Sequence, residues 1–181
     1  MRERDVSEDV EIQRALIKDR DAGFTMLVNT FQPGIYSGVR RMTNGYADAE
    51  EIAQDTFLRA YRALAGYEKE RIRTLQLRAW LWTIALNLCR NRASRSAPES
   101  PKPSITAEST HDEIPLDAAA WNRRLDRLSP HQRAAVVLRH IVDLPIADIA
   151  AISGRPEGTV KADISRGLNR LRDSMEAEAV R

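Results

Sequence analysis

Between Ser94 and Pro115 the sequence lacks the residues from which a hydrophobic core is built. The segment, SRSAPESPKPSITAESTHDEIP, contains four of the chain's eight prolines, many serines and threonines, and almost no large apolar side chain. Such a composition cannot bury enough apolar surface to offset the entropy of ordering the backbone. We therefore expect a flexible linker over residues 96–118, which divides the chain into one unit over residues 1–95 and another over residues 119–181.

Both units have the apolar spacing of α-helices, and neither has the long strict alternation of a β-strand. In the first unit we expect helices near residues 8–19, over 22–42 with a bend at Pro33 and Gly34, over 48–64, and from about 74 to 95. In the last of these helices, residues at i, i+4, i+7 and i+11 form an inward stripe of Leu77, Leu81, Ile84 and Leu88. The expected fold class is all-α, with two small helical domains.

The helix over Asp48–Leu64 has two different faces. Its apolar face consists of Ala53, Phe57, Ala60, Tyr61 and Leu64. The other face starts acidic and ends basic, an order that suits the helix dipole. Charged faces of this kind are often only solvated, so this pattern leaves open whether the face binds a partner.

Charge is distributed unevenly along a chain whose formal net charge is only +2. Residues 71–95 contain six arginines and no Asp or Glu, whereas residues 3–11 contain five acids. An arginine-rich surface without acids is typical of contact with nucleic acid.

Several classes of protein are disfavoured by the sequence. Cys89 is the one cysteine, so there is no internal disulfide, and no Cys/His spacing resembles a zinc site. The chain has no phosphate-binding Gly loop and no nucleophile paired with a His, so we expect neither an enzyme nor a cofactor. No apolar stretch could cross a bilayer, and the N-terminus MRERDVSEDVE is too charged for a signal peptide, so we expect a cytoplasmic protein without membrane insertion.

The second unit has the pattern of a helix-turn-helix. Ser129 and Pro130 are typical of a helix start, and the turn SGR separates LPIADIAAI from a longer helix. On that helix the side chains expected to pack inward are Val160, Ile164, Leu168 and Leu171. Small or hydrogen-bonding side chains lie opposite, which lets a helix enter a major groove. A helical hairpin with a solvated face is the alternative, but the cap, the turn and the small side chains favour DNA binding.

Three motifs together resemble one family. DAEEIAQDTFLRAYRAL is similar to region 2.2 of RNA polymerase sigma factors of the extracytoplasmic-function (ECF) class, the smallest members of the sigma-70 family. WLWTIALNLCRNRASR resembles the promoter-melting helix that follows, and the segment from Leu125 to Arg172 resembles region 4. The resemblance covers about residues 22–95 and 121–173, with the motifs in the family's order across a linker.

The resemblance implies a sigma factor that binds core RNA polymerase and directs promoter recognition and transcription initiation. The exposed face of the helix over 48–64 would dock on the clamp helices of the largest polymerase subunit, with Leu58 as apolar anchor. The residues implied for docking are Asp48, Glu51, Gln54, Asp55, Leu58 and Arg59.

The resemblance also implies contact with the −10 element through the arginine-rich stretch. Asn87 would read a flipped base, and the loop from about Ala65 to Thr74 would close over it. Trp82, Thr83, Leu86, Asn87 and Arg90 are expected to project away from the core stripe of their helix. We expect Trp80 in the core, whereas Trp82 is left open between packing and base stacking; Arg92 and Arg95 would meet phosphates. The residues implied for −10 DNA are Tyr67, Arg71, Arg73, Arg78, Trp82, Thr83, Asn87 and Arg90.

The helix-turn-helix would read the −35 duplex through Arg155, Gly158, Thr159, Lys161, Ala162, Ser165, Arg166 and Asn169. Asp163 departs from the basic residue that the family often has there. It could repel phosphate, accept a hydrogen bond from a cytosine, or pair with Arg166 or Arg170 to orient them, and we expect the pairing. An anti-sigma factor is a further partner that the class implies.

Two other functions remain as alternatives. A stand-alone helix-turn-helix regulator would form a symmetric dimer and bind a palindrome without polymerase, but a ligand-binding domain has no use for the acid-free stretch over residues 71–95. A small nuclease would need clustered carboxylates for a metal, and the nearest group, around Asp48 to Asp55, fits a helix start and a docking face better.

Overall fold

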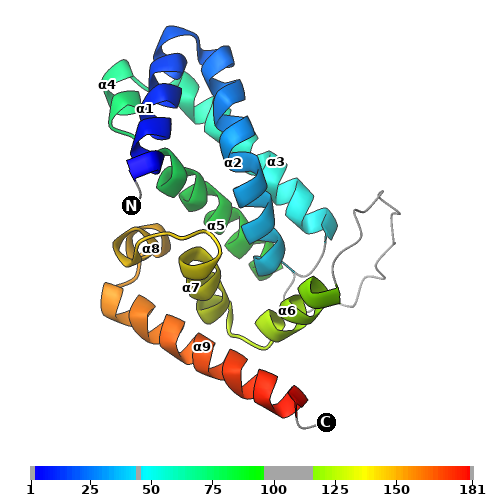
Figure 1. Cartoon of the computed structure of the whole chain (residues 1–181). Helices are drawn as coiled ribbons and strands as arrows, with labels where there is room; N and C mark the ends of the chain where they lie inside the picture. Colours follow the sequence, from blue (N-terminus) through cyan, green and yellow to red (C-terminus); the bar gives the residue numbers. More distant parts are fainter. Residues whose placement is uncertain (1–2, 44–45, 96–115, 180–181) are drawn as a thin grey trace.

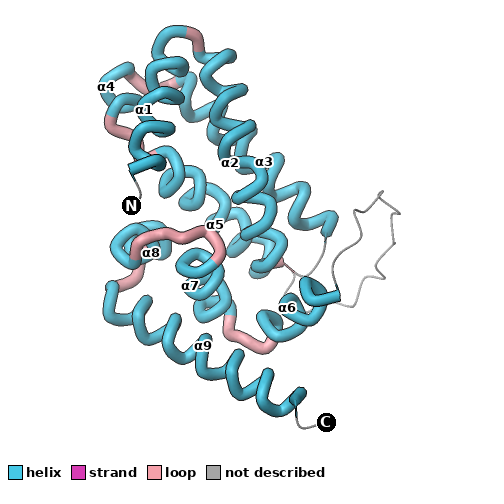
Figure 2. The backbone as a smooth tube through the Cα atoms, in the orientation of Figure 1, coloured by secondary structure: helices cyan, strands magenta, loops and turns pink. Residues whose placement is uncertain are grey.

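The computed structural model describes residues 3–43, 46–95 and 116–179, and throughout these ranges the regular structure is helical (Figures 1 and 2). The helices are α1 (Glu3–Lys18), α2 (Arg20–Met42), α3 (Tyr46–Ala65), α4 (Lys69–Arg73), α5 (Leu77–Arg95), α6 (Leu116–Asp126), α7 (Pro130–His140), α8 (Ile146–Ser153) and α9 (Glu157–Ala179). The all-α prediction is confirmed. Residues 96–115 of the expected linker lie outside the described residues, and α6 begins before the linker's expected end at residue 118.

The N-terminal unit is built from α1 to α5. Asp19 caps α2, because its carboxylate accepts hydrogen bonds from the backbone N–H groups of Asp21 at 3.0 Å and Ala22 at 3.2 Å. α2 continues through Pro33 to Met42, and α2, α3 and α5 pack side by side. Part of the expected loop over residues 65–74 is the short helix α4, which buries Ile72. The prediction of an irregular loop there was wrong in this respect.

In the C-terminal unit, α7 begins and α8 ends where the sequence predicted. Ser129 and Gln132 form a reciprocal capping box at the start of α7, and Pro130 occupies the first helical turn. Gly154 ends α8 in the left-handed conformation, with φ of 66°, which glycine adopts without the steric cost of a Cβ. This turn sets the angle at which α9 leaves α8.

One predicted core residue of α9 is not in the core. Val160, Ile164 and Leu171 are buried, but Leu168 is 40% exposed. The side of α9 that faces α7 carries its neighbour Gly167 instead. The two helices are so close there that a Cβ added at Gly167 would lie 2.7 Å from Val136 Cγ2. The close approach of α7 and α9 at a glycine therefore rotates Leu168 to the surface.

The two units pack directly against each other. Helices α7 and α8 lie under α5 (Figure 1), and one continuous cluster of buried side chains includes Leu86 of α5, Leu138 of α7 and Ile149 of α8. Within the described residues, no helix has the length and apolar character needed to span a membrane.

Candidate nucleic-acid and polymerase interfaces

The expected docking face of α3 is at the surface but partly occupied by α5. Gln54, Leu58 and Arg59 are exposed, and among the described side chains Leu58 is the most exposed large apolar one, at 46%. Arg92 of α5 places Nη2 3.1 Å from Asp48 Oδ1 and also pairs with Glu51. Arg92, which was expected at phosphates, therefore contacts the acidic start of the docking face.

The segment between α3 and α5 gathers aromatic rings and arginines. The guanidinium carbon of Arg71 lies 3.7 Å from the centroid of the Tyr67 ring, and the rings of Tyr67 and Trp80 are 5.9 Å apart. Gln13 of α1 donates a hydrogen bond of 2.9 Å to the Leu75 carbonyl and so fixes the end of this segment. Cation–π contact of this kind holds Arg71 over an aromatic face.

The structure buries Trp82, whose role was left open, and leaves Trp80, which was expected in the core, only partly covered. Trp82 is 2% exposed, whereas Trp80 is only half-buried beside Tyr67. An added Cβ at Gly38 of α2 would lie 2.8 Å from Trp82 Cζ2 and 3.2 Å from Val142 Cγ2. Trp82 is therefore enclosed where α2 meets the second unit, and the prediction that Trp82 and Leu86 project away from the core was wrong.

The sequence contained a signal for this burial. Besides the stripe of Leu77, Leu81, Ile84 and Leu88, the helix has large apolar residues on its remaining sides, and a helix that is apolar all round is usually buried. Both units cover α5, which explains why two of its faces are inside.

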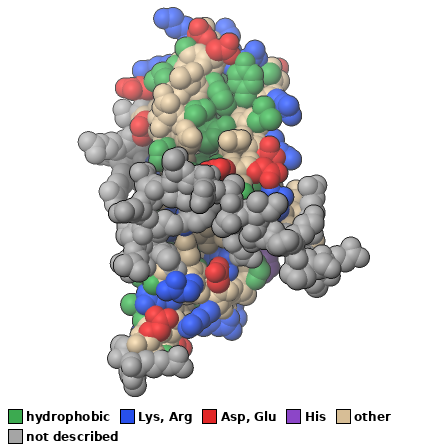
Figure 3. Space-filling view, turned by 90° about the vertical axis from the view of Figure 1, so that its right-hand side faces the viewer, with side chains coloured by type: hydrophobic (Ala, Val, Ile, Leu, Met, Phe, Trp, Pro, Cys, Tyr) green, Lys and Arg blue, Asp and Glu red, His purple; other side chains and the backbone are tan. Residues whose placement is uncertain are grey.

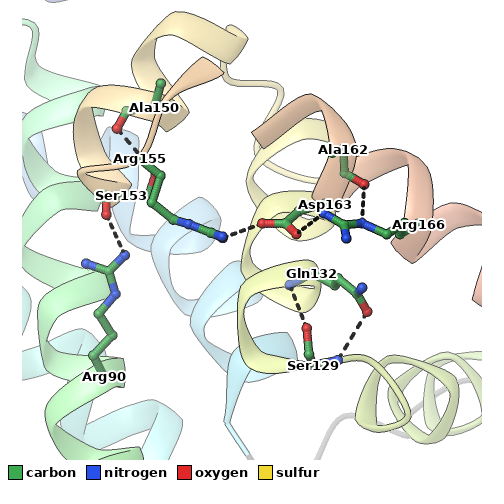
Figure 4. A network of polar contacts seen from close by, with 9 residues as sticks. All are labelled: Arg90, Ser129, Gln132, Ala150, Ser153, Arg155, Ala162, Asp163 and Arg166. Atoms are coloured by element: carbon green, nitrogen blue, oxygen red, sulfur yellow. Dashed lines mark hydrogen bonds and ion pairs between the residues drawn. The ribbon is translucent and has the colours of Figure 1, made fainter. Parts of the chain in front are cut away.

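Other predicted −10 residues of α5 differ in their access to solvent. Asn87 is exposed, while Thr83 is half-buried and donates its hydroxyl to the Ala79 carbonyl at 3.0 Å. Arg90 Nη2 donates to the Ser153 carbonyl at the end of α8, at 3.0 Å (Figure 4). Burial of Cys89 beside Arg90 raises the pKa of its thiol to about 12.

The expected −35 face of α9 lies at the surface. Gly158, Lys161, Ser165, Arg166 and Asn169 are exposed, and Thr159 and Ala162 are half-buried. Two arginines beside this face are held by polar neighbours: Arg170 donates to Gln132 Oε1 at 3.1 Å and Arg172 to Asn169 Oδ1 at 2.8 Å.

Asp163 is buried beneath that face, with 6% of its surface exposed. It pairs with Arg155 on one side and lies 3.4 Å from Arg166 Nη2 on the other (Figure 4). The expected pairing with Arg166 is confirmed, but Arg170 bonds Gln132 instead. Sequence reasoning missed the pairing of Arg155 with Asp163, because the two are eight residues apart across a turn, where helical spacing gives no guide.

Charges of both signs share the surface of the second unit. In the face shown in Figure 3, basic and acidic side chains lie together at the lower end of the molecule, and apolar side chains gather at the upper end. Arg124 and Glu178 of this unit form an ion pair, with Nη2 and Oε2 2.6 Å apart. Among the described residues, no group of three or more His, Cys, Asp or Glu could hold a metal ion.

Two family patterns match the two units. The pattern described as Sigma-70 region 2 matches residues 27–98, and that described as Sigma-70, region 4 matches residues 119–171. The chain belongs to the sigma-70 family. Curated relatives named ECF RNA polymerase sigma factors place it in the ECF class of that family, and sigma factors are not a class of enzymes.

Individual relatives resemble the chain over most of its length. The RNA polymerase sigma-E factor of Streptomyces avermitilis is 29% identical over 154 residues, covering 85% of this chain and 86% of the relative. The ECF RNA polymerase sigma factor SigW of Bacillus subtilis is 29% identical over 177 residues, covering 87% and 90%.

Two solved structures share the fold. CnrH in complex with the cytosolic domain of CnrY superposes with a TM-score of 0.71 at 23% identity, covering 94% of this chain and 98% of that chain. The sigma factor RpoE from Bartonella quintana, in complex with the anti-sigma factor NepR, gives a TM-score of 0.67 at 26% identity, covering 84% and 96%.

Proposed function

We propose that this sigma-70 family member is an alternative sigma factor that binds core RNA polymerase and directs it to promoters. One observation carries the proposal: regions 2 and 4 of the family match in order on two helical units. The exposed side chains among those proposed to meet a partner include Glu51, Gln54, Leu58, Arg59, Arg71 and Asn87 in the first unit and Gly158, Lys161, Ser165, Arg166 and Asn169 in the second. Catalysis is left to the polymerase, and the chain selects where transcription starts.

The proposed docking surface is the face of α3 that carries Asp48, Glu51, Gln54, Asp55, Leu58 and Arg59. Leu58 supports this assignment, because an exposed apolar side chain among charged neighbours can become a desolvated anchor in a complex. The charges around it would set partner choice and encounter rate more than affinity. Arg92 would be displaced from Asp48 and Glu51 when the polymerase binds.

The proposed −10 surface combines Asn87 on α5 with the Tyr67 and Arg71 pair before it. Asn87 can donate and accept hydrogen bonds at the edge of an unpaired base, and the ring and guanidinium offer stacking surfaces. The proposed −35 surface is the exposed face of α9, whose small side chains allow close approach to a major groove.

The packing of the two units bears on how they engage a promoter. Arg90 of α5 contacts Ser153, and α9 starts four residues later at Glu157, so the recognition helix begins within about 14 Å of Ser153. The −10 and −35 elements are about 25 base pairs apart, or roughly 85 Å along B-DNA. Binding both elements therefore requires the units to separate.

An anti-sigma factor is the second proposed partner, since RpoE from Bartonella quintana was solved with the anti-sigma factor NepR. The place of action would be the cytoplasm, where a sigma factor meets polymerase and promoter DNA. Neither proposal affects the docking and DNA-binding surfaces described above.

Run-off transcription with purified core polymerase on genomic fragments tests the proposed function. We expect the chain to co-migrate with core polymerase and to start transcripts at a defined set of promoters. A chain that binds DNA by itself as a symmetric dimer, and never joins core polymerase, would instead be a stand-alone regulator.

A further inference from the structure

Asp163 is a buried carboxylate on the helix proposed to read the −35 duplex. It lies on the inner side of α9, the side that also carries the buried residues Val160, Ile164 and Gly167. A carboxylate in such a place is unfavourable unless cations and hydrogen-bond donors neutralise it. In this chain the neutralising groups are two arginines, one on each side of the carboxylate.

The first arginine fixes Asp163 to the turn of the helix-turn-helix. Arg155 pairs through Nη1 with Asp163 Oδ2, and the backbone N–H of Arg155 donates to the Ala150 carbonyl of α8 at 3.1 Å (Figure 4). Arg155 is thus held at both ends, by α8 through its backbone and by α9 through its side chain. The carboxylate therefore has a fixed place relative to the turn.

The second arginine lies on the DNA side of the carboxylate. Arg166 Nη2 is 3.4 Å from Asp163 Oδ1, and Arg166 Nε donates to the Ala162 carbonyl at 3.2 Å. These two contacts direct the guanidinium back along α9 toward the start of the helix (Figure 4). The side chain is still 62% exposed, so its other N–H groups remain available to a ligand.

We propose that Asp163 is a positioning residue that fixes Arg166 to read one base pair of the −35 element. This inference rests on the proposed function. An arginine recognises guanine through a planar fork aligned with O6 and N7, and a fork that is already oriented loses less freedom when it binds. An arginine free to rotate would pair as readily with any nearby phosphate, which carries no sequence information.

The charge of Asp163 has a second effect on binding. A carboxylate close to the phosphate backbone opposes the counterion release that drives non-specific binding. Asp163 therefore lowers affinity for arbitrary DNA while it sharpens the choice of base. Loss of the carboxylate should move these two quantities in opposite directions, whereas general damage to the helix-turn-helix would lower both.

The test uses the full chain with core polymerase and promoter fragments that have a fixed −10 element and a randomised −35 element. We expect Asp163→Asn to lose about tenfold in preference at a single base pair, and to bind promoter-free duplex more tightly with a steeper salt dependence. Arg166→Lys keeps the charge without the fork and should lose the same preference. In an Arg166→Ala background, Asp163→Asn should have no further effect on base choice.

Asp173→Asn is the matched control, since it removes an exposed negative charge from the same helix and should leave −35 preference unchanged. If Asp163→Asn shows no cooperative unfolding transition and so has lost its fold, Asp163→Glu is tested in its place. This change moves the carboxylate by one methylene and should also reduce the preference at that base pair.

The outcomes separate the inference from the proposed function. A wild-type holoenzyme that selects no −35 sequence would overturn the proposed function, and this inference with it. A selective wild type whose preference survives Asp163→Asn or Arg166→Lys would overturn only the positioning role. Loss of both preference and non-specific affinity in Asp163→Asn would also overturn it, because that pattern is structural damage.

Discussion

Arg90 on α5 donates a hydrogen bond of 3.0 Å to the backbone carbonyl of Ser153, the last residue of α8. The carbonyl groups in the last turn of a helix have no partner within the helix, so a guanidinium is a favourable neighbour for them. This bond joins the helix proposed for −10 recognition to the helix-turn-helix, 63 residues further along the chain. It lies beside the buried Cys89, which makes the contact between the units accessible to experiment.

Thiol labelling of Cys89 should report when the units separate. Cys89 is buried at this contact, and its pKa is raised to about 12, so at pH 8 only about one thiol in ten thousand is ionised. We expect very slow modification of the folded chain, and faster modification in Arg90→Ala, where the Ser153 carbonyl loses its partner. Mass spectrometry of the labelled chain measures the rate without ambiguity, because Cys89 is the one cysteine.

Arg92→Ala is the control for this experiment. Arg92 also lies on α5, but it pairs with Asp48 and Glu51 of the same unit, so its loss should leave the labelling rate unchanged. Equal labelling rates in Arg90→Ala and the wild type would show that this bond does not hold the units together.

Gly38→Ala should destabilise the fold by about 1–3 kcal/mol through overpacking. The added methyl group would lie 2.8 Å from Trp82 Cζ2 and 3.2 Å from Val142 Cγ2, where three elements meet and none can retreat easily. Urea denaturation measures the change. Gly34→Ala is the control on the same helix, since nothing lies within 4 Å of its added Cβ, and there we expect a gain of roughly 0.5–1 kcal/mol.

Features set by neighbours in the sequence could be predicted before the fold was known. The capping box of Ser129 depends on four consecutive residues, and the left-handed turn needs only Gly154 after a helical pattern. The exposed face of α9 follows from helical spacing in the same way. At these positions the conformation favoured by neighbouring residues is also the one that tertiary packing requires, so the sequence alone predicts it correctly.

Features set by contact between the units could not be predicted in this way. Trp82 packs against Gly38, 44 residues earlier in the sequence, and the same glycine lies close to Val142, 104 residues later and in the second unit. The pairing of Arg155 with Asp163 depends on the angle between α8 and α9. Helical periodicity gives the direction of a side chain but does not tell which second element will cover it.

Reversing the charges of Asp48, Glu51 and Asp55 to Arg should weaken binding to core polymerase by about 100-fold or more, since it brings like charges together across the interface. Loss of the exposed pairs with Arg92 should cost the fold about 1 kcal/mol or less. Co-migration with purified core polymerase measures the first effect and thermal unfolding the second.

The same charge reversal at the exposed Glu8, Glu11 and Glu50 is the control and should leave polymerase binding intact. Undiminished binding by the variant at Asp48, Glu51 and Asp55 would show that the docking surface is not on α3.

Asn87→Ala should lower selectivity at the −10 element by about tenfold while leaving −35 preference unchanged. Asn87 is exposed on α5, although Leu86 beside it is buried, so its amide is free of the packing between the units. The amide offers two donors and an acceptor, which suits the edge of one unpaired base.

The measurement is holoenzyme selection from two libraries, one with the −10 element randomised and one with the −35 element randomised. Asn91→Ala, the same change one turn later at another exposed position, should leave both profiles as in the wild type. An intact −10 profile in Asn87→Ala, whether or not the −35 profile changes, would show that other residues of α5 recognise the base.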